Sequence, residues 1–294
     1  MGNMIKHRKI FYIISGALVL FSLVVFIALG LNPAIDFTGG SFLEVEYTNG
    51  RPEMDEIKRV IETLDLGAVV YQPTGDAGLI LRMKDITESQ HQQLLALLGD
   101  VEQKRFDSIG PVIGRELTRK AWLAIIFVIL MIVIFITWAF RKVSRPVQSW
   151  KYGLIAIAAL VHDVAIPVGV FSVLGHFFHV EVDILFITAL LTILGFSIHD
   201  TIVVFDRVRE NLKKGVGNDF EDSVVQSLKQ VRGRSVKTSL AIILVLVSFL
   251  IFGGVTTKYF TITLIMGIVF GTYSSLFLAS PLLVTWYNWQ ERRK

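Results

Sequence analysis

The clearest candidate for chemistry in this 294-residue chain is a His-Asp pair, His199 and Asp200, inside an apolar stretch. The surrounding run 184–205 is long enough to cross the roughly 30 Å hydrocarbon core of a bilayer as a helix. A charged side chain there costs at least about 2.5 kcal/mol, so an ionisable residue inside a span usually has a function. Asp206 begins the following charged segment, which places Asp200 roughly 9 Å inside the apolar region. We predict that Asp200 takes up and releases a proton.

A basic partner for Asp200 follows in the sequence. Arg234 lies just before the apolar run 236–253, at the same predicted membrane face as the end of the run that carries Asp200. Its long side chain could reach the carboxylate. An ion pair would keep Asp200 ionised, whereas burial favours the protonated form. We therefore predict that Arg234 and Asp200 form a proton relay, and we assign Arg232 and Lys237 to the ordinary excess of basic residues on the cytoplasmic side.

A second pair, His162 and Asp163, lies near the middle of the apolar run 152–174, shortly before Pro167. Two interpretations remain open for it: a buried polar pair that joins helices, or a second site of proton transfer. Neighbouring residues on a helix point about 100° apart, and the chain has 0 cysteines, so we expect no metal site and no cofactor. An intramembrane aspartyl hydrolase built on Asp163 and Asp200 is disfavoured because neither lies in a Gly-x-Gly-Asp motif.

The elements that position these residues follow from composition. Hydrophobic residues make up 53% of the chain and charged residues 18%, a balance typical of an integral membrane protein. We predict a six-transmembrane-helix bundle from the apolar runs 10–29, 121–140, 152–174, 184–205, 236–253 and 260–287. Lys and Arg gather in the N-terminal tail, the loop 141–151, the segment 206–237 and the C-terminal tail, so both termini should be cytoplasmic. The net charge of +4 reflects this asymmetry, and we expect no nucleic-acid binding.

The segment 32–120 between the first two spans has the pattern of a small soluble domain. Apolar alternation predicts strands, and apolar residues at helical spacing predict helices, in the order βαββαβ. The strands are expected at 41–48, 68–72, 79–83 and 101–108, and the helices at 54–64 and 88–98. This order predicts an extracytoplasmic α+β ferredoxin-like domain. The predicted organisation is 1–31, 32–120 and 121–294, with a cytoplasmic amphipathic helix in 206–235.

Two further motifs stand out. The first joins the soluble domain to the first span, where glycines permit unusual backbone angles; an ordinary turn would also explain it. Its residues are Asp36, Phe37, Thr38, Gly39 and Gly40. With the return segment 110–114, it predicts two joints about which the domain can swing. The second motif is a stripe of small residues that predicts close helix packing, against a neighbour left undecided. Its members are Gly267, Gly271, Ser275 and Ala279.

Together these motifs resemble the SecF family, within the resistance-nodulation-division (RND) superfamily of proton-driven transporters. The resemblance rests on DFTGG at 36–40, GFSIHDTIVVFDRVREN at 195–211, the Arg234 region and GTYSSLFLASP at 271–281. It implies an RND-type six-helix bundle that pairs with SecD beside the SecYEG channel in the bacterial cytoplasmic (inner) membrane. It also implies proton passage through Asp200 and Arg234. His199 departs from the family pattern, where Asn is common, and can itself titrate near neutral pH.

The resemblance implies an accessory subunit of the Sec translocase, without enzymatic activity, that uses the proton-motive force to promote protein export and membrane insertion. Expected partners are SecD, SecYEG, YajC, YidC and the unfolded preprotein; the expected coupling ion is H⁺, with Na⁺ as the alternative. Two rival hypotheses are an independent RND-type exporter of small molecules or lipids, and a passive scaffold of the insertase machinery. The chain lacks a second six-span half, which argues against the exporter.

Overall fold

The chain folds into two compact units, Pro33–Leu123 on the one hand and Met1–Asn32 with Ala124–Lys294 on the other. The computed structural model describes residues 5, 7–139, 149–254 and 257–292. The basic residues Lys6, Arg293 and Lys294 and the loop 141–148, which entered the prediction of orientation, lie outside the described residues. The predicted domain boundaries at 31/32 and 120/121 lie within a few residues of the division between the two units.

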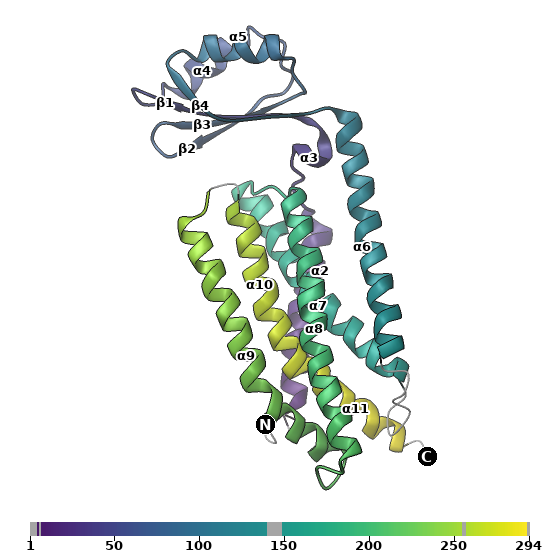
Figure 1. Ribbon diagram of the computed structural model, residues 1–294. Helices are drawn as coiled ribbons and strands as arrows, with labels where there is room; N and C mark the ends of the chain where they lie inside the picture. Colours follow the sequence, from purple (N-terminus) through teal and green to yellow (C-terminus); the bar gives the residue numbers. More distant parts are fainter. Residues whose placement is uncertain (1–4, 6, 140–148, 255–256, 293–294) are drawn as a thin grey trace. The chain divides into compact units, whose positions relative to one another are not determined.

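The smaller unit is a four-stranded antiparallel sheet with two helices on one face (Figure 1). After the short helix α3 (Ile35–Thr38), its elements follow the predicted order βαββαβ. They are β1 (Gly40–Tyr47), α4 (Met54–Ile61), β2 (Val70–Thr74), β3 (Gly78–Met83), α5 (Glu88–Leu98) and β4 (Val101–Ile109). The strand order is β2-β3-β1-β4, and alternate residues of β1 and β3, such as Leu43, Val45 and Leu81, form the core with the helices.

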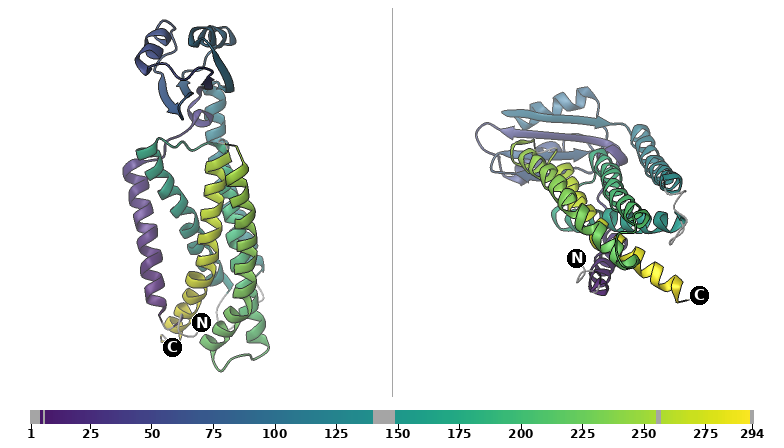
Figure 2. Two further views of the ribbon diagram at one scale, coloured as in Figure 1. Left: turned by 90° about the vertical axis from the view of Figure 1, so that its left-hand side faces the viewer. Right: turned by 60° about the horizontal axis from the view of Figure 1, so that its bottom comes forward.

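The larger unit is helical. Among the described residues, six helices are long and apolar enough to cross a membrane, as predicted. They are α2 (Arg8–Leu29), α6 (Pro111–Ala139), which begins in the smaller unit, α7 (Ser149–Phe178), α8 (Ile184–Lys213), α9 (Phe220–Phe252) and a last span that starts with α10 (Lys258–Ser274). Helices α7, α8 and α10 pack on one another at the centre, α2 packs on α7, and α9 packs on α8 and α10 (Figures 1 and 2). The central helices α7 and α8 carry the buried acids Asp163 and Asp200.

The segment 206–235, predicted to form an amphipathic helix along the membrane surface, does not form a single helix. Residues up to Lys213 continue α8, and residues from Phe220 belong to α9, so the segment forms the closed end of a helical hairpin. The apolar residues that suggested an amphipathic helix, Val224, Val225 and Leu228, are buried in the same cluster as α8 residues. Their apolar face is covered by α8, which replaces the membrane surface as its partner.

The last span is also less regular than its apolar pattern suggested. After α10 the helix widens into a π-helical turn, η2 (Ser275–Ala279), before it resumes as α11 (Ser280–Glu291). Pro281 explains the change because it has no backbone N–H to continue the ladder. Within the wider turn, the Ser280 hydroxyl donates to the Ser275 carbonyl at 3.0 Å.

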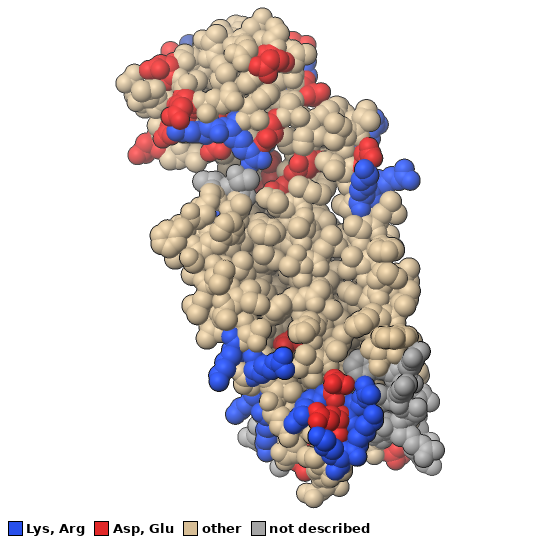
Figure 3. Space-filling view, in the orientation of Figure 1, with Lys and Arg blue, Asp and Glu red and all other residues tan. Residues whose placement is uncertain are grey.

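Charge is unevenly distributed along the helical unit. Figure 3 shows a wide uncharged band on this face and, at its lower end, a dense group of Lys, Arg, Asp and Glu. The start of α2, the end of α11 and the α8–α9 connection all lie at this charged end (Figure 1). Helices α2, α6 and α9 expose large apolar side chains, such as Ile13, Phe127 and Val245. The unit therefore has the surface of a membrane-embedded bundle.

Candidate functional site

Asp200 lies on the inner face of α8, and its side chain is only 8% exposed. The hydroxyl of Ser235, on α9, donates a hydrogen bond of 2.8 Å to its Oδ1 atom. Its Oδ2 atom is buried and has no hydrogen-bond partner among the described residues. An ionised carboxylate would leave an anionic oxygen buried without a donor, which is costly, whereas a neutral carboxyl group fits this arrangement. The site thus suits a group that changes its protonation state.

The predicted ion pair between Asp200 and Arg234 is not formed in this structure. Among the described residues, no salt bridge joins Asp200 to a Lys or Arg. Arg234 lies on an exposed face of α9, because consecutive helical residues point about 100° apart and Ser235 takes the inward position. Helix α9 is the predicted partner of α8. Its rotation about its own axis, however, brings the Ser235 hydroxyl to the Asp200 carboxyl group in place of the Arg234 guanidinium.

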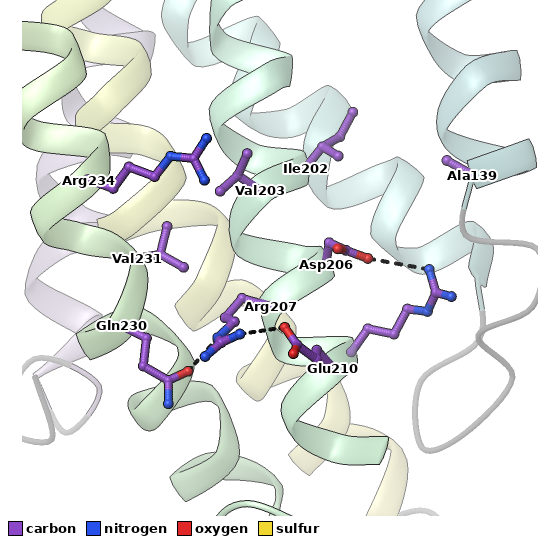
Figure 4. Close-up of a pocket in the computed structure, with 10 residues that line it drawn as sticks. Ala139, Ile202, Val203, Asp206, Arg207, Glu210, Gln230, Val231 and Arg234 are labelled. Atoms are coloured by element: carbon purple, nitrogen blue, oxygen red, sulfur yellow. Dashed lines mark hydrogen bonds and ion pairs between the residues drawn. The ribbon is translucent and has the colours of Figure 1, made fainter. Parts of the chain in front are cut away.

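Arg234 instead lines a cleft of about 510 Å³ at the charged end of the helical unit. Figure 4 shows its side chain extending from α9 toward α8, above an ion-pair group formed by Arg207 and Glu210. Arg207 also donates from Nε to Gln230 at 2.5 Å, and Arg209 pairs with Asp206 at 3.3 Å. The cleft thus contains basic and acidic groups that are mostly paired with each other.

His199 is exposed, on the opposite side of α8 from the buried face. His199 is therefore a neighbour of Asp200 in sequence, but it is exposed where Asp200 is buried. The structure brings Asp200 together with Ser235, but brings neither His199 nor Arg234 into hydrogen-bonding contact with it. The predicted role of His199 stays a prediction.

The second pair is the most enclosed acid-base group in the described part of the chain. His162 is 1% exposed and Asp163 is 0% exposed, near the middle of α7. His162 Nδ1 and Asp163 Oδ1 are 2.9 Å apart. The hydroxyls of Ser197, on α8, and Ser274, on α10, both donate to Asp163 Oδ2, the latter at 2.7 Å. Asp163 thus joins three helices.

Small residues make this close approach possible. A Cβ atom at Gly271 would lie 3.2 Å from the Ser197 side chain, and one at Gly267 would collide with Ile193. The next small residue of the stripe, Ser275, hydrogen-bonds Thr201 at 3.2 Å. The neighbour of the stripe, left undecided by the sequence, is therefore α8 of the same chain.

Sequence analysis did not single out the serines that complete the site. Ser197, Ser235 and Ser274 all lie in apolar helices, and their hydroxyls contact the two buried carboxyl groups. A spacing of four residues, seen for Ser197 and Thr201 and again for Ser235 and Ser239, places hydroxyls on one helix face. This spacing is the feature of the sequence that could have indicated these serines.

The motif 36–40 packs against the first turn of α6. A Cβ atom at Gly39, whose φ is +74°, would lie 2.9 Å from Pro111 Cα, and one at Gly114 would lie 2.9 Å from Gly39 N. Thr118 Oγ1 donates to the Phe37 carbonyl at 3.4 Å. Of residues 110–114, predicted as a return joint, those from Pro111 onward form the start of α6, and the two segments contact each other. Their glycines allow close packing, while the predicted swing of the domain stays a prediction.

Comparison with known proteins supports a single family. The model of the family "Protein export membrane protein SecD/SecF, C-terminal" matches residues 90–289. The chain is 39% identical to the protein translocase subunit SecF of Thermobaculum terrenum, over 98% of this chain and 95% of that one. It is 38% identical to SecF of Anaerolinea thermophila, over 99% of this chain and 98% of that one.

A solved structure shows the same fold. The crystal structure of SecDF, a translocon-associated membrane protein from Thermus, superposes with a TM-score of 0.82 at 32% sequence identity. The match covers 97% of this chain but 38% of the SecDF chain, so this chain spans well under half of the length of that relative.

Proposed function

The chain belongs to the SecF family of protein translocase subunits, and from that membership we propose how it uses its buried carboxyl group. Together with SecD it is an accessory subunit of the Sec translocase, and it uses the proton-motive force to promote the export of unfolded preproteins and membrane insertion. SecYEG is the channel that it serves, and YajC and YidC are further expected partners. Protonation and deprotonation of Asp200 drive the cycle.

The proposal rests on the different hydrogen bonding of the two carboxyl oxygens of Asp200. Oδ1 accepts a hydrogen bond from Ser235 across the α8–α9 interface, and Oδ2 is buried without a partner. Loss of the proton creates an uncompensated charge that favours a different packing of α8 and α9. We propose that Arg234, next to Ser235 on α9, meets Asp200 in that second arrangement. One charge moving through 100 mV supplies about 2.3 kcal/mol for the change.

The distribution of charge supports an orientation. Basic residues of the α8–α9 hairpin, including Arg207, Arg209 and Lys214, lie at the same end of the helical unit as the start of α2 and the end of α11. Excess Lys and Arg in short loops favours the cytoplasmic side. We propose that both termini are cytoplasmic in the inner membrane, and that the sheet unit is an extracytoplasmic ferredoxin-like domain that handles the preprotein.

Export into inverted membrane vesicles under an imposed pH gradient tests this function. Asp200→Asn should abolish the stimulation by the gradient while leaving gradient-independent export and assembly with SecD intact. Asp206→Asn is the matched control, because this residue lies on the same helix but is exposed and paired with Arg209.

The passive scaffold remains the rival hypothesis, since buried polar groups also hold helices together. Full gradient-dependent export by Asp200→Asn would favour the scaffold. Stimulation by a sodium gradient, with none by a pH gradient, would identify Na⁺ as the coupling ion.

A further inference from the structure

The His162–Asp163 pair has no part in the cycle just proposed, although it is the more deeply buried of the two acid-base sites. Its exposed fractions of 1% and 0% exclude solvent from both side chains. It lies at the midpoint of α7, so in a membrane it is far from either surface. Ionisable groups at such a depth are usually functional.

The contacts of the pair are compatible with an ionised Asp163. Asp163 faces one imidazole nitrogen and two hydroxyl groups, from His162, Ser197 and Ser274. An ionised carboxylate only accepts hydrogen bonds, so three donors around it fit the charged form. His162 Nδ1 must then carry a hydrogen atom, which it donates to Asp163 Oδ1. In a neutral imidazole this assignment leaves Nε2 without a proton.

The Nε2 atom of His162 is buried and has no hydrogen-bond partner among the described residues. It lies among rings: Tyr273 stacks on the imidazole at 5.8 Å between centroids, and Phe270 contacts it edge-on at 6.2 Å. With neutral His162, the pair carries one net negative charge in apolar surroundings. Addition of one proton to Nε2 turns the pair into an imidazolium-carboxylate ion pair with no net charge, which costs less to bury.

We propose that His162 and Asp163 form a second proton-binding site of this chain, in which the proton binds to His162 Nε2 and Asp163 remains the counter-ion. The step is a simple protonation: H⁺ binds to the Nε2 lone pair, and no other bond is broken. Of the two interpretations that the sequence left open for this pair, the proposal selects proton transfer. The same contacts also join the three helices.

Few other ionisable groups act on the pair. Tyr273 is the titratable residue that α10 presents to it, and its hydroxyl already accepts a hydrogen bond from Ser15 of α2 at 3.3 Å. On α8, the ionisable groups nearest in sequence to Ser197 are His199, which is exposed, and Asp200, about one helical turn further along. Within the described residues, the only salt-bridge partner of Asp163 is His162.

The two proton sites are therefore linked through α8. Ser197 contacts Asp163, and Asp200, on the next turn of the same helix, contacts Ser235. Because both side chains of the pair are shielded from solvent, we expect proton exchange at His162 to require movement of the helices around it. This link to export rests on the proposed function, whereas proton binding itself can be measured without export.

Nitrogen-15 NMR of the histidine-labelled full-length protein in lipid vesicles tests the proposal. The spectrum should contain a signal from an unprotonated Nε2 that disappears in His162→Gln and is unchanged in His176→Gln, a control at the exposed end of α7. This signal should convert to that of a protonated nitrogen as the pH falls. Loss of the counter-ion in Asp163→Asn should lower the pH of conversion by about 1 to 3 units.

A second variant tests the proposal even if Asp163→Asn does not fold. Ser274→Ala keeps the Asp163 carboxylate but removes one of its hydrogen-bond donors. The carboxylate then stabilises the His162 imidazolium more strongly, so conversion should occur at higher pH. Opposite shifts in the two variants are expected only if His162 binds the proton against Asp163. An unchanged Nε2 signal across the pH range of the folded protein, equal conversion in Ser274→Ala and wild type, or a shift caused by Na⁺ at constant pH would overturn the proposal. If His162 titrates as expected but a pH gradient does not stimulate export by the wild-type protein, only the proposed function is overturned.

Discussion

Ser235 of α9 donates a hydrogen bond of 2.8 Å to the Asp200 carboxyl group of α8, while its neighbour Arg234 lies on an exposed helix face. This arrangement makes the hydroxyl the partner of the buried acid in the present conformation. It separates two roles that the sequence assigned to one residue: holding Asp200 between helices, and compensating its charge.

The first prediction concerns that hydroxyl. Ser235→Ala removes a hydrogen bond to the neutral carboxyl group whose net value is about 1 kcal/mol, so gradient-driven stimulation of export should fall roughly fivefold. Ser235→Thr should retain activity because it keeps the hydroxyl. Ser248→Ala, on an exposed face of the same helix, is the control. Equal export by Ser235→Ala and wild type in inverted vesicles would contradict the role of this contact.

The second prediction concerns Arg234. Because the side chain is exposed, Arg234→Met should change the stability of the purified protein by less than about 0.5 kcal/mol. If gradient-driven export is nevertheless lost, Arg234 acts in an arrangement other than the one described here. Thermal unfolding in detergent, measured beside the export assay, separates the two effects; a large loss of stability would mean that Arg234 has a structural role.

The third prediction concerns the contact between α8 and α10. A side chain at Gly271 would be forced against Ser197 and the nearby Asp163, so Gly271→Val should destabilise the bundle by about 1 to 3 kcal/mol. Gly195→Val on α8 is the matched control, since a Cβ atom there meets nothing within 4 Å. Similar unfolding temperatures for the two variants would show that the stripe does not require a glycine.

The fourth prediction concerns the junction between the motif 36–40 and α6. A Cβ atom at Gly114 would meet backbone atoms of Gly39 and Phe37, which cannot move independently of the chain. Gly114→Val should therefore expose this junction to proteolysis, whereas Arg115→Val, at the next and exposed position, should not. Limited proteolysis in lipid vesicles compares the two; equal cleavage would refute the tight junction.

The fifth prediction concerns pH and the sheet unit. Hydrogen bonds from Gln92 and then from His91 hold the pKa of the exposed Glu88 carboxyl below its usual value of 4.5. A carboxyl group whose pKa is lower in the folded state stabilises the fold above its unfolded pKa, and this stabilisation is lost as pH falls through the folded pKa. Helix α5 should therefore open more readily below about pH 4.5.

Hydrogen exchange of the α5 amides at several pH values provides the measurement. The acid sensitivity of these amides should be smaller in Glu88→Gln than in wild type. Asp76→Asn, in the exposed turn between β2 and β3, should leave it unchanged.

Secondary structure could be predicted from the sequence more completely than the packing of helices against each other. The spans and the strand-helix order could be predicted because apolar periodicity reports local structure, and α5 was placed at its observed bounds, Glu88–Leu98. The partner of Asp200 could not, because rotating α9 by one residue exchanges Arg234 for Ser235 at the inner face, and only tertiary packing sets that rotation. The same limit applied to Val224 and Leu228, whose apolar face fits a membrane surface or a neighbouring helix equally well.

Helix α6 is one of the two chain connections between the sheet unit and the helical unit. Gly114 ties its first turns to the sheet unit, while its residues from Ala124 onward belong to the helical unit, with no break in the helix between them. The other connection, around Gly30 and Pro33, has no helical hydrogen-bond ladder. The backbone dihedral angles around Gly30 and Pro33 can therefore change without loss of helical hydrogen bonds, whereas α6 can bend sharply only where its ladder is broken.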